Sequence, residues 1–241
     1  MLPILPMSAP DTVPEEARRR IRSFVRREGR ITDAQKDALE RLVPRYGLDH
    51  VEGPLDLVAI FGRSAPVTFE IGFGNGDALL ARAQANPSRD YVGVEVHRPG
   101  LGRLLHHVER AGLANVRAMG RDAVDILRDQ VADAALDEIV IEFPDPWHKK
   151  RHHKRRLVQP EFVRLACDRL AIGGRLILAT DWEPYARHML EALATEPRLE
   201  NLAADGRFVP RPASRPKTRF ECRGERLGHA VFDLAFVRRR P

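Results

Sequence analysis

The feature that most constrains the fold is a regular alternation of short apolar runs with helix-like segments, which begins at residue 67. The apolar runs span residues 67–71, 91–96, 116–119, 137–143 and 175–180. Segments with apolar residues at helical spacing follow them, at residues 77–85, 101–111, 123–131, 160–170 and 183–195. Such alternation is typical of a parallel sheet with helices on both faces. The sequence therefore predicts a doubly wound α/β fold with a mostly parallel, Rossmann-like sheet.

The C-terminal part of the chain ends this alternation. A last apolar run at residues 231–237 is followed by no helix, and we expect it to be an antiparallel strand inserted into the sheet. The pair Gly173-Gly174 reads as a turn before the strand at 175–180, since glycine favours turns. We expect the crossovers between parallel strands to be right-handed.

Three segments precede the alternation. Residues 1–32 are rich in Pro and Arg and read as a flexible basic arm. Residues 33–45 have the apolar spacing of a helix, and residues 48–66 read as irregular. The predicted organisation is an arm, residues 1–32, followed by a single domain, residues 33–241.

The composition excludes several classes of protein. The chain has 241 residues, of which 43% are hydrophobic, and this is enough for one large core. It has no run of about 18 apolar residues, and residues 1–14 lack the basic and apolar regions of a signal peptide. Two cysteines, Cys167 and Cys222, are too few for a disulfide framework or a zinc knuckle. We expect a cytoplasmic protein with no membrane segment and no metal, monomeric or, as the alternative, dimeric.

Positive charge is concentrated in three segments. Residues 18–30, 148–156 and 207–226 together contain 20 of the 40 Lys and Arg residues but only three of the 34 acidic ones. These segments carry a charge of +17, and the rest of the chain carries −11. Single basic runs are often only solvated faces, but three on an acidic chain favour a polyanionic partner such as RNA. A membrane surface is the weaker alternative, because the runs lack an apolar face at helical spacing.

A glycine loop follows the first predicted strand. Glu70 precedes Gly72, Gly74 and Gly76, and glycines at this point let the backbone approach a nucleotide-like ligand. The spacing is GxGxG rather than the dinucleotide GxGxxG, and Asp77 stands where the third glycine would be. An acid there would repel a phosphate at the helix N-terminus. The loop therefore favours S-adenosylmethionine, which carries positive sulfonium and ammonium groups, although a plain strand–helix turn is an alternative explanation.

Two further acids follow the next two strands. Glu95 ends the second strand, where an acid commonly accepts hydrogen bonds from a ribose diol. Asp122 follows the third strand and could accept from an adenine amino group, or could simply cap the helix that begins at residue 123. Together with Glu70, these acids end three consecutive strands, and a shared crevice explains this better than chance.

The fourth strand runs into a second motif, Phe-Pro-Asp-Pro-Trp at residues 143–147. Pro144 and Pro146 bracket Asp145 and restrict the backbone around its carboxylate. Trp147 could form a wall of a pocket, stack on a base, or belong to the core. Enzymes that methylate exocyclic amines of bases often carry an acid or amide followed by two prolines, whereas only one follows Asp145.

Ring nitrogen N7 of guanine fits this motif better than an exocyclic amine. Its lone pair lies in the ring plane and carries no proton, so an enzyme mainly has to align and desolvate it. A carboxylate nearby can accept hydrogen bonds from N1–H and N2–H₂ of guanine. It can also offset the positive charge that methylation places on the ring.

From about residue 18 to residue 239, the sequence resembles the bacterial tRNA (guanine-N7-)-methyltransferases. The matching segments are FEIGFGNG (69–76), VGVEVHRPG (92–100), FPDPWHKKRHHKRRL (143–157), ATDWEPYARHML (179–190) and RPASRPKTRFE (211–221). The basic run after residue 145 and the late TRFE are specific to this family. The glycine loop alone is not.

The resemblance implies a class I methyltransferase fold with a seven-stranded sheet. It implies S-adenosylmethionine as donor, S-adenosylhomocysteine as product, and the guanosine at position 46 of the tRNA variable loop as acceptor. It implies one catalytic residue, Asp145. The residues it assigns to the cofactor are Glu70, Gly72, Gly74, Gly76, Glu95, Asp122 and Asp145.

The resemblance also implies contacts with the tRNA substrate. The residues it assigns to the substrate are Lys149, Asp181, Thr218, Arg219, Phe220 and Glu221. The residues it assigns to RNA binding are Arg151, Lys154, Arg155 and Arg156. One departure is Glu142, where the family more usually has an uncharged residue, and the sequence does not give the direction of this side chain.

Three other functions are weaker alternatives. A methyltransferase of another RNA base would keep every motif except the specific target. A non-catalytic RNA-binding module would not need Glu70, Glu95 and Asp145 intact. A nicotinamide dehydrogenase is the least favoured, because the glycine spacing and Asp77 do not suit a pyrophosphate.

Overall fold

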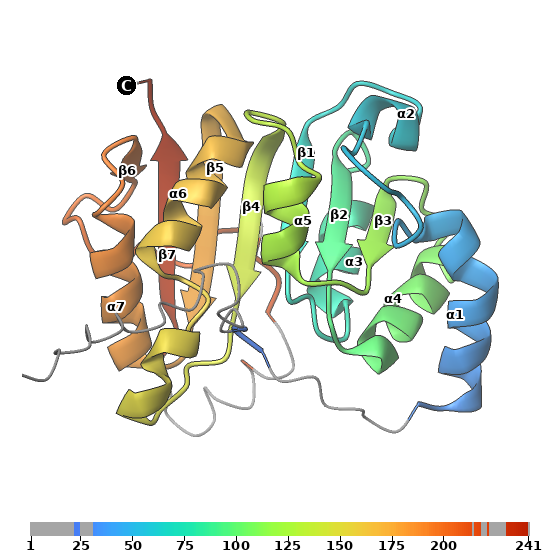
Figure 1. Ribbon diagram of the computed structural model, residues 1–241, viewed down its shortest axis with the longest axis horizontal. Helices are drawn as coiled ribbons and strands as arrows, with labels where there is room; N and C mark the ends of the chain where they lie inside the picture. The colour runs from blue at the N-terminus through green and yellow to red at the C-terminus, as the bar shows by residue number, and fades with distance from the viewer. Residues whose placement is uncertain (1–21, 25–30, 214, 218–220, 222–229, 241) are drawn as a thin grey trace, which may run out of the picture.

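Seven strands form one sheet in the computed structural model, which describes residues 22–24, 31–213, 215–217, 221 and 230–240. The strand order is β3-β2-β1-β4-β5-β7-β6 (Figure 1). The strands are β1 (Val67–Ile71), β2 (Asp90–Val94), β3 (Val116–Met119), β4 (Leu136–Glu142), β5 (Leu170–Thr180), β6 (Leu199–Asn201) and β7 (Phe232–Arg238).

The first five strands are parallel, and β7 is antiparallel to both of its neighbours. Strand β7 therefore lies between β5 and β6 and points the opposite way, as its arrow in Figure 1 shows. The predicted mostly parallel sheet with an inserted antiparallel last strand is confirmed. Because strands β1 to β5 share a direction, their carboxyl ends meet at one edge of the sheet.

Helices cover both faces of the sheet. The helices are α1 (Asp33–Tyr46), α2 (Leu57–Phe61), α3 (Asp77–Ala85), α4 (Arg98–Arg110), α5 (Ala123–Asp129), α6 (Pro160–Arg169), α7 (Glu183–Leu193) and the 3-10 helix η2 (Lys150–Arg155). Helices α1, α3 and α4 pack with β2 and β3 in one apolar cluster. Helices α5, α6 and α7 pack side by side on the other face in the main core (Figure 1).

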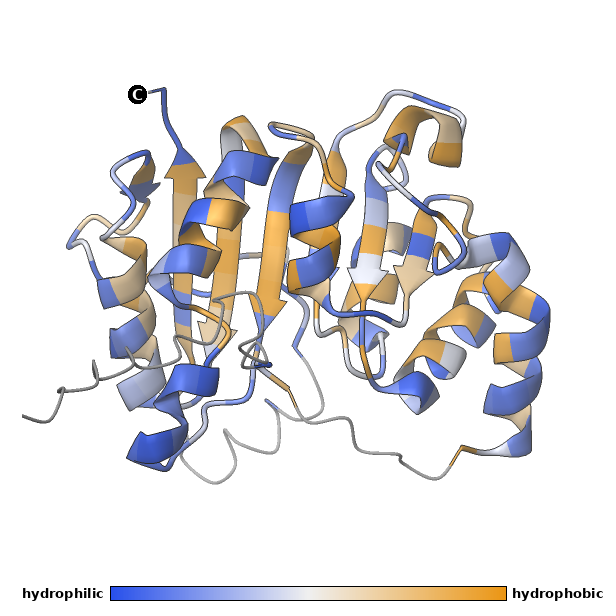
Figure 2. Ribbon diagram, in the orientation of Figure 1, coloured by the Kyte–Doolittle hydropathy of each residue, from blue (hydrophilic) through white to orange (hydrophobic). Residues whose placement is uncertain are grey.

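Successive side chains of β1 point to opposite faces of the sheet, and both faces are buried. Phe69 and Ile71 are buried in the main core beneath α5 and α6. Thr68 and Glu70 point to the opposite face and are also buried, at 0% and 3% exposure. Both faces of the strand are thus covered, and β4 beside it is coloured as apolar along its middle in Figure 2. A charged side chain on such a strand requires a buried partner.

Parts of the sequence prediction were wrong. Helix α2 lies within the segment that reads as irregular, and no element had been assigned to the residues of η2 and β6. The predicted turn at Gly173-Gly174 does not form, because β5 continues through both glycines and its pairing with β4 shifts register there. Gly173 absorbs this irregularity with a φ of +83°. Short elements of this kind are held by tertiary contacts and leave little periodicity in the sequence.

Most of the predicted arm, residues 1–32, lies outside the described residues. Its described parts are residues 22–24 and 31–32, and Thr32 forms a capping box with Gln35 of α1. Within the described ranges, no helix combines the length and the apolar character needed to cross a membrane.

Candidate active site

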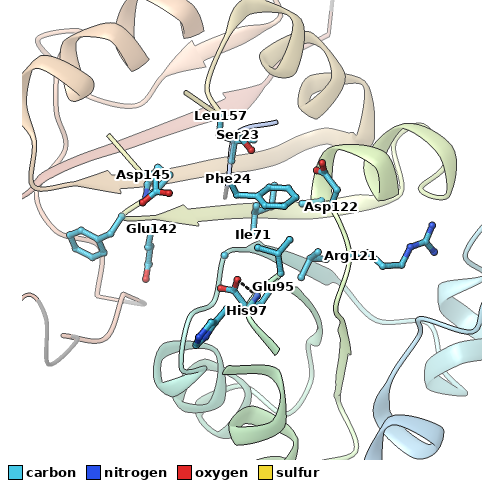
Figure 3. Close-up of a pocket in the computed structure, with 16 residues that line it drawn as sticks. Ser23, Phe24, Ile71, Glu95, His97, Arg121, Asp122, Glu142, Asp145 and Leu157 are labelled. Atoms are coloured by element: carbon cyan, nitrogen blue, oxygen red, sulfur yellow. Dashed lines mark hydrogen bonds between the residues drawn. The ribbon is translucent and has the colours of Figure 1, made fainter. Parts of the chain in front are cut away.

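A cleft of about 300 Å³ opens at the carboxyl ends of β1, β2 and β4. We name it the glycine-loop cleft. Its walls carry Ser23, Phe24, Ile71, Gly72, Val94, Glu95, Val96, His97, Arg121, Asp122, Ala123, Glu142, Phe143, Pro144, Asp145 and Leu157 (Figure 3). Apolar side chains make most of the wall, and carboxylates stand at several points on it. Of the predicted cofactor residues, Gly72, Glu95, Asp122 and Asp145 lie here.

The glycine loop has a backbone that only glycine adopts easily. Gly72, Gly74 and Gly76 have φ values of +76°, +57° and +79°. A Cβ at Gly72 or Gly74 would meet nothing within 4 Å, so these glycines leave open space in front of the loop. A Cβ at Gly76 would instead lie 2.7 Å from Leu104 Cδ1, so this glycine permits close packing on α4.

Helix α4 also holds the loop from behind. A Cβ on Gly100 would lie 2.0 Å from the carbonyl oxygen of Gly74, closer than any side chain could. The absence of a side chain at residue 100 lets the first turn of α4 lie against the loop backbone. Gly100 ends the segment VGVEVHRPG (92–100), but the sequence does not show this contact, because it joins residues 26 positions apart.

Glu95 is tied to the loop by two backbone hydrogen bonds. Its carboxylate accepts from Gly74 N–H at 2.8 Å. It also accepts from His97 N–H at 2.9 Å (Figure 3). Each carboxylate oxygen can accept more than one hydrogen bond, so a ligand hydroxyl can still approach it. Glu95 therefore fixes the loop and presents negative charge to the cleft at the same time.

Asp122 caps a helix, which was the simpler of its two interpretations. Its carboxylate accepts from Val124 N–H at 3.0 Å, and it occupies the N-cap position of α5. The same residue lines the glycine-loop cleft. The two roles are compatible because a cap uses only part of the hydrogen-bonding capacity of a carboxylate.

Asp145 is exposed just beyond the end of β4, in a strained segment. Phe143 and Trp147 flank it with φ values of +52° and +47°, a region that costs about 1–3 kcal/mol for residues other than glycine. Phe143 N–H donates to Ala179 O at 2.8 Å, and the Trp147 indole N–H donates to Ser23 O at 3.0 Å. These bonds hold the bend that places Asp145, whereas the sequence had indicated the prolines alone.

Glu70 does not line the cleft but lies beneath it. Its carboxylate, only 4% exposed, is 2.7 Å from Nη1 of Arg82 on α3. The same guanidinium pairs with Glu142 at the end of β4. Arg82 therefore joins the ends of β1 and β4 through two buried carboxylates. In Figure 3 the carboxylates of Glu142 and Asp145 lie on opposite sides of the strand end, which gives the direction that the sequence left open.

Burial raises the pKa of both carboxylates that pair with Arg82. Loss of solvation raises the pKa of Glu70 to about 7, while the positive charge of Arg82 acts against this rise and the charge of Glu142 adds to it. Burial likewise raises the pKa of Glu142, again against the effect of Arg82. One guanidinium thus faces two carboxylates that have lost most of their water.

A second cavity of about 890 Å³ adjoins the cleft. We name it the aromatic cavity, and its wall carries Phe143, Pro144, Asp145, Pro146, His148, Asp181, Trp182, Glu183, Pro184, Ala230 and Phe232. Phe143, Pro144 and Asp145 line both spaces. The structure thus brings Asp181, predicted to contact substrate, to the same cavity as Asp145.

The basic run at residues 148–156 folds as η2 beside these cavities. Arg151 and Lys154 are exposed, and Arg155 stacks over the Trp147 ring with 5.1 Å between its Cζ and the ring centroid. Lys154 and Arg155 line a basic groove of about 640 Å³ that continues from the glycine-loop cleft. Lys149, predicted to contact substrate, is exposed at the start of η2.

Arg156 differs from the rest of the run because it is 4% exposed. Its Nε donates to Pro146 O at 3.0 Å, and its guanidinium lies over the ring of Tyr185 at 4.9 Å. Arg156 thus anchors the loop that carries Asp145 to α7. The exposed cations that remain for the predicted RNA surface are Arg151, Lys154 and the half-buried Arg155.

The late basic segment contains a buried ion cluster. Glu221, predicted to contact substrate, is 3% exposed and accepts from Arg215 at 2.7 and 2.8 Å. Arg215 also pairs with Asp233 on β7 at 2.6 Å. This cluster fastens the segment to the sheet near Phe143, whose ring lies 5.8 Å from the Arg215 guanidinium. The predictions for Thr218, Arg219 and Phe220 fall outside the described residues.

Two cleft residues come from far away in the sequence. Ser23 and Phe24 line the glycine-loop cleft, and in Figure 3 the Phe24 ring lies between Ile71 and Asp122. From the sequence alone this region reads only as a charged arm. Phe24 stands between Arg22 and Arg26 in the sequence, and nothing there indicates a contact with a cleft formed by residues 71–157.

Comparison with known proteins shows the family of this chain. The family model described as "Putative methyltransferase" matches residues 64–234. A tRNA (guanine-N(7)-)-methyltransferase of Stutzerimonas stutzeri (strain A1501) is 57% identical over 92% of this chain and 93% of its own. One from Methylococcus capsulatus (strain Bath) is 58% identical over 91% and 95%.

Solved structures show the same fold. The 16S rRNA methyltransferase KamB superposes with a TM-score of 0.59 at 15% identity, covering 81% of this chain and 99% of its own. TrmN from Thermus thermophilus gives a TM-score of 0.52 at 20% identity, covering 76% and 47%. The fold and the matching family model define a class I methyltransferase. The chain belongs to the family of the tRNA (guanine-N(7)-)-methyltransferases.

The raised pKa of Glu70 predicts a pH-dependent stability. Between its ordinary value of 4.5 and about 7, folded Glu70 holds a proton that the unfolded chain has released. Its contribution to stability is therefore complete below about pH 4.5 and is lost as the pH rises to about 7. We expect the free energy of unfolding of the wild type, relative to Glu70→Gln, to fall by about 1–3 kcal/mol between pH 5 and 8.

Urea unfolding at several pH values measures this difference. Glu52→Gln, which removes an exposed carboxylate, serves as the control and should show no such trend. A difference between the wild type and Glu70→Gln that does not vary with pH would show that Glu70 ionises normally.

Proposed function

We propose that this protein transfers a methyl group from S-adenosylmethionine to N7 of a guanosine in tRNA, at position 46 of the variable loop. The observation that carries the proposal is the shared wall of the two cavities. Phe143, Pro144 and Asp145 border both the glycine-loop cleft and the aromatic cavity. A donor in the first space and a base in the second would meet beside Asp145. The names of the relatives supply the tRNA, the guanine and the nitrogen.

The glycine-loop cleft fits the donor chemically. Gly72 and Gly74 leave open space before the loop, which a side chain at either position would fill. The carboxylates of Glu95, Asp122 and Asp145 suit positive groups and hydroxyls, and Ile71, Val94 and Leu157 offer apolar surface for an adenine. We propose that Gly76 and Glu70 act indirectly, through packing on α4 and through Arg82.

When bound, S-adenosylmethionine supplies a methyl group on a positively charged sulfur, and the positive charge passes to the guanine as N7 is methylated. No residue has to remove a proton, since N7 carries none. Asp145 would lie beside the reacting edge of the guanine, and its charge would stabilise the ring as it becomes positive. Phe143 and the prolines would exclude water from the meeting point.

Three exposed or half-exposed cations would hold the RNA backbone. Arg151, Lys154 and Arg155 lie on η2, immediately after the segment that carries Asp145. Because Arg156 ties this segment to α7, a phosphate bound on η2 would have a defined position relative to Asp145. A tRNA substrate also implies a cytoplasmic location.

One experiment tests donor, acceptor atom and position together. The purified protein is incubated with methyl-labelled S-adenosylmethionine and an unmodified tRNA transcript, which is then reduced and cleaved with aniline at N7-methylguanosine. We expect a single cut in the variable loop. Labelled RNA without a cut would replace N7 with another atom or base, and a cut elsewhere would replace only the position.

Removal of the Asp145 carboxylate should impair turnover without unfolding the protein, because this side chain is exposed. We expect Asp145→Asn to lower kcat by about 10²–10³-fold, the loss typical of one stabilising group at developing charge, and Asp145→Ala to nearly abolish turnover. Glu191→Gln, an exposed carboxylate on α7, is the matched control. Full activity in Asp145→Ala would remove this residue from the mechanism.

The salt dependence of tRNA binding should show whether the cations on η2 contact phosphates. Removal of one cation that neutralises a phosphate reduces the slope of log K against log [salt] by about 0.7–0.9. We expect a triple variant, Arg151→Gln, Lys154→Gln and Arg155→Gln, to reduce the slope for tRNA binding by about two to three. Arg240→Gln removes an exposed cation beyond the far end of β7 and should leave the slope unchanged. An unchanged slope in the triple variant would place the RNA elsewhere.

A further inference from the structure

Trp182 has no assigned role, yet it stands at the wall of the aromatic cavity. It is the N-cap residue of α7 and directly follows Asp181. Its backbone is fixed, since its N–H donates to Thr180 Oγ1 at 3.3 Å and its carbonyl accepts from Tyr185 N–H at 2.9 Å. The ring is therefore mounted on a rigid element.

The exposure of Trp182 is unusual for its size. The residue is 38% exposed although it lies in a concave site lined by Phe143 and Phe232. Val58, Ile172 and Leu202 are also exposed apolar residues, but they line neither the cleft, the cavity nor the groove. An exposed tryptophan inside a cavity offers a flat surface to a ligand.

His148 holds the Trp182 ring from the side. The two ring centroids are 4.5 Å apart and the planes make an angle of 69°, an edge-to-face contact. His148 belongs to the segment after Asp145, and Trp182 belongs to the segment after Asp181. This contact fixes the distance between the two walls of the cavity that carry these carboxylates.

We propose that the target guanine stacks on Trp182, with its N1–H and N2–H₂ edge toward Asp181 and its N7 toward Asp145 and the glycine-loop cleft. The inference rests on the proposed function and assigns the base-stacking residue of that site. An aromatic ring with two carboxylates beside it suits guanine, because guanine has a flat ring and carries N1–H and N2–H₂ as neighbouring donors. Glu183 also lines the cavity, but it is paired with Arg187 at 2.6 Å and contributes less charge.

The positive charge that methylation places on guanine strengthens its stacking on Trp182. Methylation at N7 makes the guanine ring positive, and tryptophan binds cations over its face better than the other aromatic residues do. Stacking on Trp182 would thus favour the methylated ring over the neutral one, together with the two carboxylates. Such a surface stabilises the state in which the charge develops, and so it acts on the rate as well as on binding.

Two substitutions separate stacking from simple apolar contact. Trp182→Phe keeps an aromatic face, whereas Trp182→Leu keeps an apolar side chain without one. For methylation of the tRNA transcript we expect Trp182→Leu to lower kcat/KM by about ten- to hundredfold and Trp182→Phe by no more than about fivefold. Ile172→Ala removes a side chain that is 55% exposed near the opposite edge of the sheet and should match the wild type.

A binding measurement tests the charge argument without the need for turnover. Isothermal titration calorimetry compares GMP with 7-methyl-GMP as probes. We expect the wild type and Trp182→Phe to prefer the methylated nucleotide, and Trp182→Leu to lose most of this preference. Thermal unfolding of each variant shows that its fold is intact.

The outcomes distinguish the inference from the proposed function. If wild-type protein yields the aniline cut while Trp182→Leu keeps both its kcat/KM and its preference for 7-methyl-GMP, the stacking role is overturned and the function stands. If the wild type yields no cut and prefers neither nucleotide, the proposed function fails and the inference fails with it.

Discussion

The common direction of strands β1 to β5 is the constraint on which the rest of this structure depends. Parallel pairing forces every connection to cross back over the sheet, and it gathers the carboxyl ends at one edge. Glu95, Asp122, Asp145 and Asp181 follow four different strands and still lie within two adjoining cavities. Strand β7 runs the other way, so its amino end reaches this edge. Phe232 at the start of β7 thereby joins the cavity wall.

The site separates two kinds of charge. Cations lie outside, on η2 and along the basic groove, where water screens them and a polyanion can reach them. Carboxylates line the cavities, where they suit positively charged groups of a ligand. Between these layers, Arg82, Arg156 and Arg215 are buried cations that hold the segments together. Three of the arginines that give this chain its basic character thus serve the framework of the site.

The sequence predicted the fold and the location of the site because both depend on local patterns. Helix α3 begins and ends where its spacing indicated, at Asp77 and Ala85, and the glycine loop follows β1 as the motif indicated. The environments of Glu70 and Arg156 could not be predicted in this way. Their partners, Arg82 and Tyr185, are chosen by tertiary packing, so a strand-end acid and a cation in a basic run proved to be buried anchors. Phe24 entered the cleft for the same reason.

The contact between Gly100 and the glycine loop has a consequence for the thermodynamics of binding. Helix α4 touches the carbonyl of Gly74, and Glu95 holds its N–H, so one peptide segment is restrained from both sides. Its conformational entropy has been given up during folding and is not lost a second time when a ligand arrives. A preorganised loop lets more of the contact energy appear as affinity. This rigidity requires glycine at position 100, because any side chain there would overlap the carbonyl oxygen of Gly74.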